Sequence, residues 1–139
     1  IDADLGDKAS GVLYALGGSG GGLTLYMDKG QLVYEYNAMI IERNIARSAA
    51  VVPAGKHRIE VTTTLATAQP LSPADVVLNV DGQEVARTTV KRTVPGAFSA
   101  SETFDVGVDL GSPVSIDYFD RRPFKFDGKI LGVKVTLKP

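Results

Sequence analysis

Four aspartates gather in the last third of the chain, at Asp105, Asp109, Asp117 and Asp120. Carboxylate oxygens are the hard ligands that calcium prefers, and their spacing here is that of a loop. The dense alternation D-x-D-x-D is missing, however, and "FDVGVDL" alternates like a strand with Asp105, Gly107 and Asp109 on one face. We therefore favour a solvated acidic loop, in which Asp109 caps a turn, and we assign no metal ligand.

A second group of side chains combines basic and aromatic residues: Tyr118, Phe119, Arg121 and Arg122. Guanidinium groups suit sulfate, phosphate or carboxylate, so these four residues predict a ligand-binding ledge at one edge of the molecule. The ordinary alternative is a soluble rim. The alternation in "FKF" favours core positions for Phe124 and Phe126.

Catalytic groups are scarce. A serine triad needs a histidine base, and His57 is the one histidine in the chain. We interpret it as a side chain at the end of a strand. There is no cysteine, the glutamates are scattered singly, and the jelly-roll glucanase pattern E-x-D-x-x-E does not occur. We therefore assign no catalytic residue.

The glycine run "GGSGGG" at residues 17–22 allows three interpretations: a phosphate cradle, a linker or a tight bend. Neither G-x-G-x-x-G nor G-x-x-x-x-G-K-[ST] fits the run, and a strand pattern rather than a helix follows it. Strand patterns on both sides also argue against a linker. The run predicts a tight bend inside a β-protein.

The elements that position these groups are β-strands almost throughout. Period-2 alternation predicts strands at 23–27, 31–37, 57–65, 76–80, 83–93 and 133–137. Asp28-Lys29-Gly30 and Asp81-Gly82 predict hairpins. No segment predicts a convincing helix, since 38–47 fits a β-branched strand at least as well.

Length and composition complete the prediction of an all-β, two-sheet antiparallel sandwich in a single domain, residues 1–139. The chain is 44% hydrophobic and has a net charge of −1, which gives no sign of nucleic-acid binding. No apolar run reaches membrane length. The chain begins at Ile1 rather than methionine, so we expect a processed or excised piece.

Several stretches resemble the C-terminal portion of bacterial arylsulfatases, the large enzymes of the alkaline-phosphatase-like sulfatase superfamily. They are residues 11–37, 52–61, 76–95 and 104–118, and "DVGxDxGSPV" is the most specific motif. The resemblance extends from about residue 9 to 137. It implies a jelly-roll sandwich of the concanavalin A-like type.

The chain departs from this family in lacking the C/S-x-P-x-R motif from which sulfatases make formylglycine. The resemblance therefore implies an upstream catalytic domain that carries the formylglycine and calcium, and a non-catalytic piece here with no cofactor. It leaves the compartment open, with the periplasm as one option for the parent enzyme.

Two functions remain open: packing on and supporting that catalytic domain, or binding a sulfated glycan as a carbohydrate-binding module. Sugar binding favours exposed aromatic platforms, and the chain has no tryptophan and five tyrosines. The tyrosine candidates are Tyr14, Tyr26, Tyr34, Tyr36 and Tyr118. We favour the supporting role, because some of these tyrosines must be buried.

Overall fold

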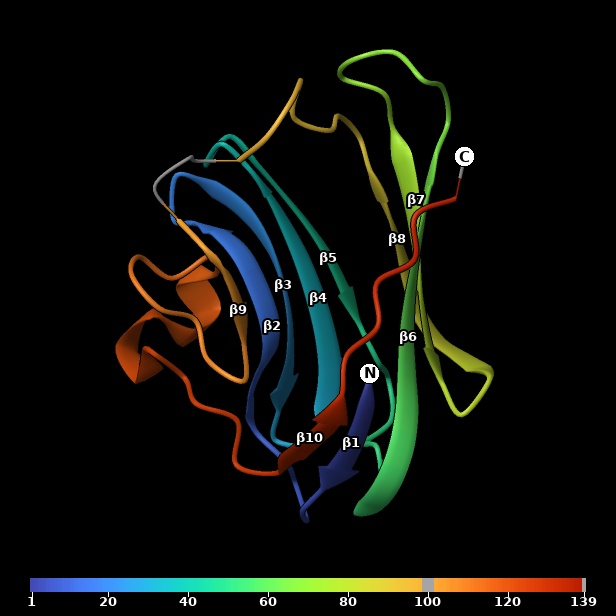
Figure 1. Ribbon diagram of the computed structural model, residues 1–139, viewed down its shortest axis with the longest axis vertical. Coiled ribbons are helices and arrows are strands. Elements are labelled where there is room, and N and C mark those ends of the chain that lie inside the picture. Colours follow the sequence, from blue (N-terminus) through green and yellow to red (C-terminus); the bar gives the residue numbers. More distant parts are fainter. Residues whose placement is uncertain (99–101, 139) are drawn as a thin grey trace.

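Ten strands form two antiparallel sheets that face each other as a β-sandwich in residues 1–98 and 102–138, the part of the chain that the computed structural model describes (Figure 1). Sheet A has the order β10-β1-β6-β7-β8. Its strands are β10 Lys129–Gly132, β1 Asp2–Leu5, β6 Gly55–Leu65, β7 Ala74–Val80 and β8 Gln83–Val90. Sheet B has the order β5-β4-β3-β2-β9. Its strands are β5 Glu42–Arg47, β4 Gln31–Ala38, β3 Gly21–Asp28, β2 Gly11–Gly18 and β9 Phe104–Val106. The two-sheet antiparallel prediction is confirmed.

Both predicted hairpins are present, with the backbone that a type I′ turn requires. Asp81 and Gly82 have φ of 51° and 82° and connect β7 to β8, whose end residues Val80 and Gln83 pair. Lys29 and Gly30 have φ of 50° and 87° between β3 and β4. Positive φ at both central residues matches the twist of the flanking strands.

The core lies between the sheets and is built from the alternate residues of each strand. It includes Leu13, Leu25, Leu32, Ile59 and Leu78, all at most 1% exposed. A second, smaller apolar cluster lies on the outer face of sheet B. There residues 107–124, which we call the cover segment, contribute Val114, Tyr118 and Phe124. The buried positions of Phe124 and Phe126 confirm the interpretation of "FKF".

The cover segment also contains the one helical element in the described residues, the short 3₁₀ helix η1, Ile116–Arg121. Ser115 caps it by accepting a hydrogen bond from the Asp117 backbone N–H. The sequence did not predict this turn of helix, because six residues are too short for a helical period to stand out.

Two predicted strands differ from the strands of the structure. The strand expected at 83–93 ends at Val90, and the expected strand at 133–137 is wrong, since the last strand is Lys129–Gly132. The sequence 133–137 alternates as a strand should, but β1, the neighbour of β10, begins at Asp2 and pairs no further than Gly132. In contrast, the choice of strand over helix within 38–47 is confirmed by β5.

Candidate functional site

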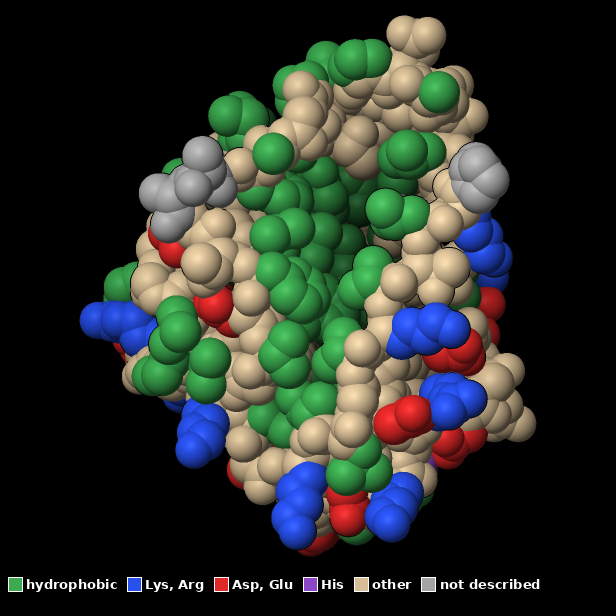
Figure 2. Space-filling view, in the orientation of Figure 1, with side chains coloured by type: hydrophobic (Ala, Val, Ile, Leu, Met, Phe, Trp, Pro, Cys, Tyr) green, Lys and Arg blue, Asp and Glu red, His purple; other side chains and the backbone are tan. Residues whose placement is uncertain are grey.

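A hollow lies between the two sheets at the end of the sandwich that holds the β2–β3 turn, and hydrophobic side chains gather in it (Figure 2). Its volume is about 590 Å³. Leu16, Leu23 and Tyr36 line it from sheet B, and Leu65 lines it from the end of β6. A hollow of this size and character suits apolar side chains or an apolar ligand.

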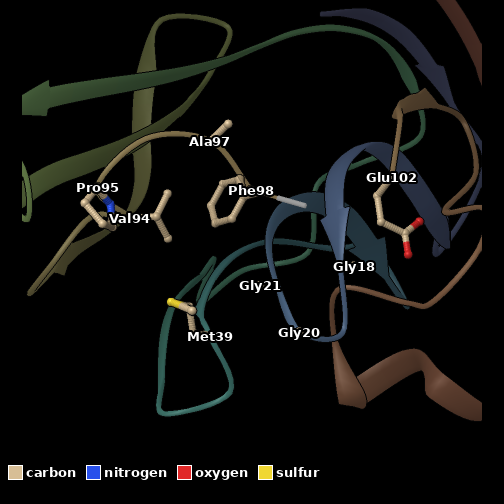
Figure 3. A pocket seen from close by; sticks show the side chains of 9 residues that line it. All are labelled: Gly18, Gly20, Gly21, Met39, Val94, Pro95, Ala97, Phe98 and Glu102. Atoms are coloured by element: carbon tan, nitrogen blue, oxygen red, sulfur yellow. The ribbon is translucent and has the colours of Figure 1, made fainter. Parts of the chain in front are cut away.

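The loop 93–98 borders the hollow and is held there by Tyr36. The Tyr36 hydroxyl accepts a hydrogen bond from the Val94 backbone N–H at 2.9 Å, and its ring lies 5.3 Å from the Phe98 ring, centroid to centroid. A second pocket of about 440 Å³ lies on the other side of Phe98, against the glycine turn (Figure 3). In Figure 3, Met39, Val94 and Pro95 approach it from one side and Glu102 from the other.

The β4–β5 turn presents three successive large apolar residues, Met39, Ile40 and Ile41, to solvent. Ile40 is 72% exposed and Ile41 81% exposed. Met39 and Ile40 have φ of 55° and 70°, in the left-handed region that a β-branched side chain rarely adopts. Backbone strain and exposed apolar surface at one turn together indicate a contact site rather than a structural need.

We call the surface formed by this turn and the neighbouring loop the apolar end. It consists of Met39, Ile40, Ile41, Val94, Pro95 and Phe98. This surface was not among the sites predicted from the sequence. The signal was the run "MII", which is too apolar for an exposed turn between two strands.

The glycine run forms the β2–β3 hairpin, in which Gly18 pairs with Gly21, and the predicted tight bend is confirmed. The glycines are needed for close approach. A Cβ on Gly18 would lie 2.3 Å from the Ser112 Oγ, and one on Gly22 would lie 2.4 Å from the Leu16 carbonyl oxygen. Ser112 in turn accepts a hydrogen bond from Ser19 N–H and donates one to Glu102. The turn is thus tied to Ser112 of the cover segment and, through it, to Glu102.

The predicted ledge residues lie together on and beside η1, but their functional groups already have partners. Arg121 donates to Asp28 at 2.9 Å, and its guanidinium lies 4.3 Å from the centroid of the buried Phe124 ring. The Arg122 guanidinium lies 4.3 Å from the Phe119 ring centroid. The bond to Asp28 holds the cover segment to sheet B, and the two ring contacts lie within the cover segment. The half-exposed Phe119 and the two guanidiniums remain a predicted ligand site.

Tyr118 differs from the other three ledge residues because its side chain is fully buried. Its hydroxyl donates to Asp109 and lies 3.2 Å from the Thr24 hydroxyl. Burial, together with the nearby Asp109 carboxylate, raises the pKa of Tyr118 far above its usual value. A ligand on the surface would not contact this residue.

The acidic group does not lie on one strand face as expected, because β9 ends at Val106. Asp105 accepts hydrogen bonds from the Thr103 hydroxyl and the Leu110 N–H, and it points inward while Phe104 and Val106 point to solvent. Asp109 is buried and caps a turn through the Val114 N–H at 2.8 Å. Burial raises the pKa of Asp109. Within residues 1–98 and 102–138, no three carboxylate or histidine side chains are grouped to hold a metal ion.

A buried polar cluster under the cover segment was also missed by the sequence analysis. Glu35 of β4 is fully buried and receives two hydrogen bonds from Arg43, at 2.7 and 2.9 Å, and one from the Ser115 hydroxyl. Arg43 also forms an ion pair with Asp117 at 3.1 Å. These hydrogen bonds to the Glu35 carboxylate raise the pKa of the Arg43 guanidinium further above its already high value. The signal was a single charge in the otherwise apolar and aromatic strand "LVYEY".

His57 lies in β6 and is held between Asp81 and Pro53. Its Nδ1 is 2.6 Å from the Asp81 carboxylate and its Nε2 is 2.8 Å from the Pro53 carbonyl oxygen. The hydrogen bond to Asp81 raises the pKa of His57. No hydroxyl nucleophile contacts either nitrogen in the described chain, and the pair fastens the β7–β8 turn to β6.

The described residues include no helix with the length and apolar character needed to cross a bilayer. Comparisons with protein-family models, curated proteins and solved structures found no match for the chain.

Proposed function

We propose that the chain is a non-catalytic β-sandwich domain of a bacterial arylsulfatase, and that it packs on and supports an upstream catalytic domain. The observation that carries this proposal is the apolar end, where Met39, Ile40 and Ile41 are exposed on a strained turn. A monomeric surface rarely presents such a run without a partner. The upstream domain, with its formylglycine and calcium, would supply both the partner and the chemistry.

The fold proposed for this domain is the concanavalin A-like jelly roll that the resemblance implies. Two features support it. The first and last strands, β1 and β10, are neighbours in sheet A. The chain also crosses from sheet A to sheet B between β1 and β2, and returns between β5 and β6.

The supporting role is favoured over glycan binding by the positions of the aromatic side chains. Four of the five tyrosines are buried, and Tyr14 is mostly covered by its stacking on Phe104. Phe104 and Phe119 are the large exposed aromatic side chains in the described residues, and one face of each ring is already occupied, by Tyr14 and by the Arg122 guanidinium. A sugar platform needs an open ring face.

The experiment compares aryl sulfate hydrolysis by the 139-residue chain and by a longer polypeptide that carries the adjoining upstream sequence. We expect turnover only from the longer form. In the longer form Ile41→Lys should lower the temperature of half-inactivation, because it places a charge in the proposed contact. Ile116→Lys is the matched control, since Ile116 is comparably exposed, at 70%, but lies on η1.

Two results would contradict the proposal. One is sulfate ester turnover by the short chain that survives rigorous purification. The other is a longer form whose inactivation temperature is the same with Ile41→Lys as with Ile116→Lys, since that would remove the apolar end from the interface.

A further inference from the structure

The edge of β6 is paired along only half of its length. Residues 55–58 pair with β1, and Ile59 and Ile1 exchange two main-chain hydrogen bonds of 2.8 Å, one of them from the Ile1 ammonium group. Beyond Ile59, β7 continues on one side as far as Leu65. On the side where β1 pairs with the first half of β6, no main-chain group in residues 1–98 and 102–138 bonds to β6 beyond Ile59.

Main-chain groups of alternate residues point to the same edge of a strand. Because Ile59 bonds to Ile1, the N–H and C=O groups of Val61, Thr63 and Leu65 point to the open side. We call residues 61–65 of β6 the free edge. Three successive donor and acceptor pairs without a neighbour form a template for an additional strand.

The side chains of the free edge also lack cover. Ile59, Val61, Thr63 and Leu65 share the inner face of sheet A with their β7 partners, which are all buried. In β6, exposure instead rises along this face, from 1% at Ile59 to 54% at Leu65. Leu65 lines the hollow, so the uncovered part of β6 opens directly into it (Figure 2).

The C-terminal segment, residues 133–138, also pairs with no strand in the described part of the chain. It rises from β10 past the N-terminus toward the same end of the sandwich as the free edge (Figure 1). An irregularity in the β1–β10 pairing sets Asp2 opposite Gly132, so that Val133 corresponds to Ile1 on the inner face. Val135 and Leu137 follow at alternate positions and are 71% and 90% exposed. The segment has the pattern of a strand without a neighbour.

We propose that a strand joined to Ile1 continues β1 and fills the place between the free edge and the C-terminal segment. The two registers agree on its position. In the β1–β6 register, the second residue before Ile1 faces Val61, and in the β1–β10 register it faces Val135. The fourth residue before Ile1 likewise faces Thr63 and Leu137. The added strand completes sheet A, and the segment 133–138 becomes its outer neighbour.

The registers also define the chemistry of this strand. Its second, fourth and sixth residues before Ile1 point inward with Ile1, toward the hollow, so they are apolar and β-branched or larger. Its odd-numbered residues point to solvent and are polar. The inference rests on the proposed function, because it requires a preceding segment, and it makes that segment part of the sandwich rather than a loose tether.

The experiment adds six residues before Ile1 and follows amide hydrogen exchange by NMR. One variant carries valine at the second, fourth and sixth positions and threonine between them. The matched control has the same composition shifted by one residue, which turns every valine to solvent. We expect slow exchange at the Val61, Thr63 and Leu65 amides, and a rise in Tm on the order of 5 °C, only in the first variant. Proline at its second position should lower the protection of all three amides together with the Tm, since it lacks the N–H that would donate to the Val61 carbonyl and so weakens the added strand.

Equal protection in both registers, or none in either, would overturn the proposal. So would a free peptide of the same sequence that protects these amides as strongly as the joined one, since the occupant would then be a separate partner. Protection in the unextended chain that appears with dimer formation would assign the place to a second copy. None of these outcomes depends on sulfatase activity, so the strand and the proposed function fail separately.

Discussion

The outer face of sheet B and the free edge of β6 differ most clearly in how far their side chains are covered and their polar groups are hydrogen-bonded. The outer face of sheet B is closed: the cover segment lies on it, and Glu35, Arg43 and Ser115 bond to one another beneath it. The free edge is open: the outward main-chain groups of Val61, Thr63 and Leu65 have no partner in the described part of the chain, and Leu65 is exposed beside the hollow. The closed region pairs most of its buried polar groups internally, the exceptions being the Tyr26 hydroxyl and one Asp109 oxygen. The free edge leaves main-chain groups unpaired and apolar side chains uncovered.

This difference separates stability from interaction. Buried charge is tolerated on the closed side because each charged group has partners, and breaking such a set is costly. Unpaired strand edges and exposed apolar turns are hazards that proteins usually cover. We therefore expect substitutions on the closed side to change the stability of the isolated chain, and substitutions on the open side to change what the chain binds.

Glu35→Ala should have the largest effect on stability. It removes the acceptor of hydrogen bonds from the Arg43 guanidinium and the buried Ser115 hydroxyl, and the loss should cost about 3 kcal/mol, because a hydrogen bond to a charged group is worth about 1.5–3 kcal/mol. Arg43 is partly exposed and keeps its ion pair with Asp117, so it is not left as a buried unpaired charge. Urea unfolding would measure this loss. Glu84→Ala, which removes the solvent-exposed ion pair with Arg87, is the control and should leave the midpoint unchanged. Equal midpoints for the two variants would erase the contrast between the regions.

The same change made on each side sharpens the comparison. Tyr118→Phe removes a buried hydrogen bond to the Asp109 carboxylate and should cost about 1.5–3 kcal/mol. Tyr36→Phe removes a neutral hydrogen bond from Val94 N–H beside the hollow and should cost about 0.5–1.5 kcal/mol. Both losses are read from denaturant unfolding. The reverse order would mean that the loop 93–98, not the cover segment, is the more firmly held.

The sequence predicted the parts of this fold that local pattern determines. Alternation identified β3, β4, β6 and β7, and Asp81-Gly82 identified its hairpin, because each signal lies within a few neighbouring residues. The strand at 133–137 failed since a strand also needs a neighbour, which no local pattern records. Tyr118 was assigned to a surface ledge for a similar reason: its burial depends on Thr24, which is 94 residues away in the chain. The apolar end and the Glu35 cluster likewise arise from long-range contacts.

His57, the single histidine of the chain, lies in the paired half of β6 and should make the free energy of unfolding depend on pH. The hydrogen bond to Asp81 raises the folded-state pKa of His57 above its unfolded value of about 6.5. The added stability is therefore fully present below pH 6.5, and it is lost as the pH rises through the raised pKa. The unfolding midpoint of the wild type should fall over this interval relative to that of His57→Gln. Asp81→Asn should behave like His57→Gln, and parallel curves for all three would remove this pair from the account of sheet A.

The smallest effect is expected from calcium removal, and it tests whether the closed side is held by side chains alone. Asp105 already accepts two hydrogen bonds, from the Thr103 hydroxyl at 2.6 Å and the Leu110 N–H at 2.8 Å. One Asp109 oxygen accepts from Val114 N–H and the Tyr118 hydroxyl, and Asp117 is paired with Arg43. An ion would have to displace these donors, because calcium needs six to eight oxygen ligands. A calcium chelator should therefore leave the Tm unchanged.

A drop of several degrees that added calcium restores, and that is absent in Asp109→Ala, would mean that a metal ion supports the cover segment. The closed side would then depend on a ligand, and the contrast with the free edge would be one of degree.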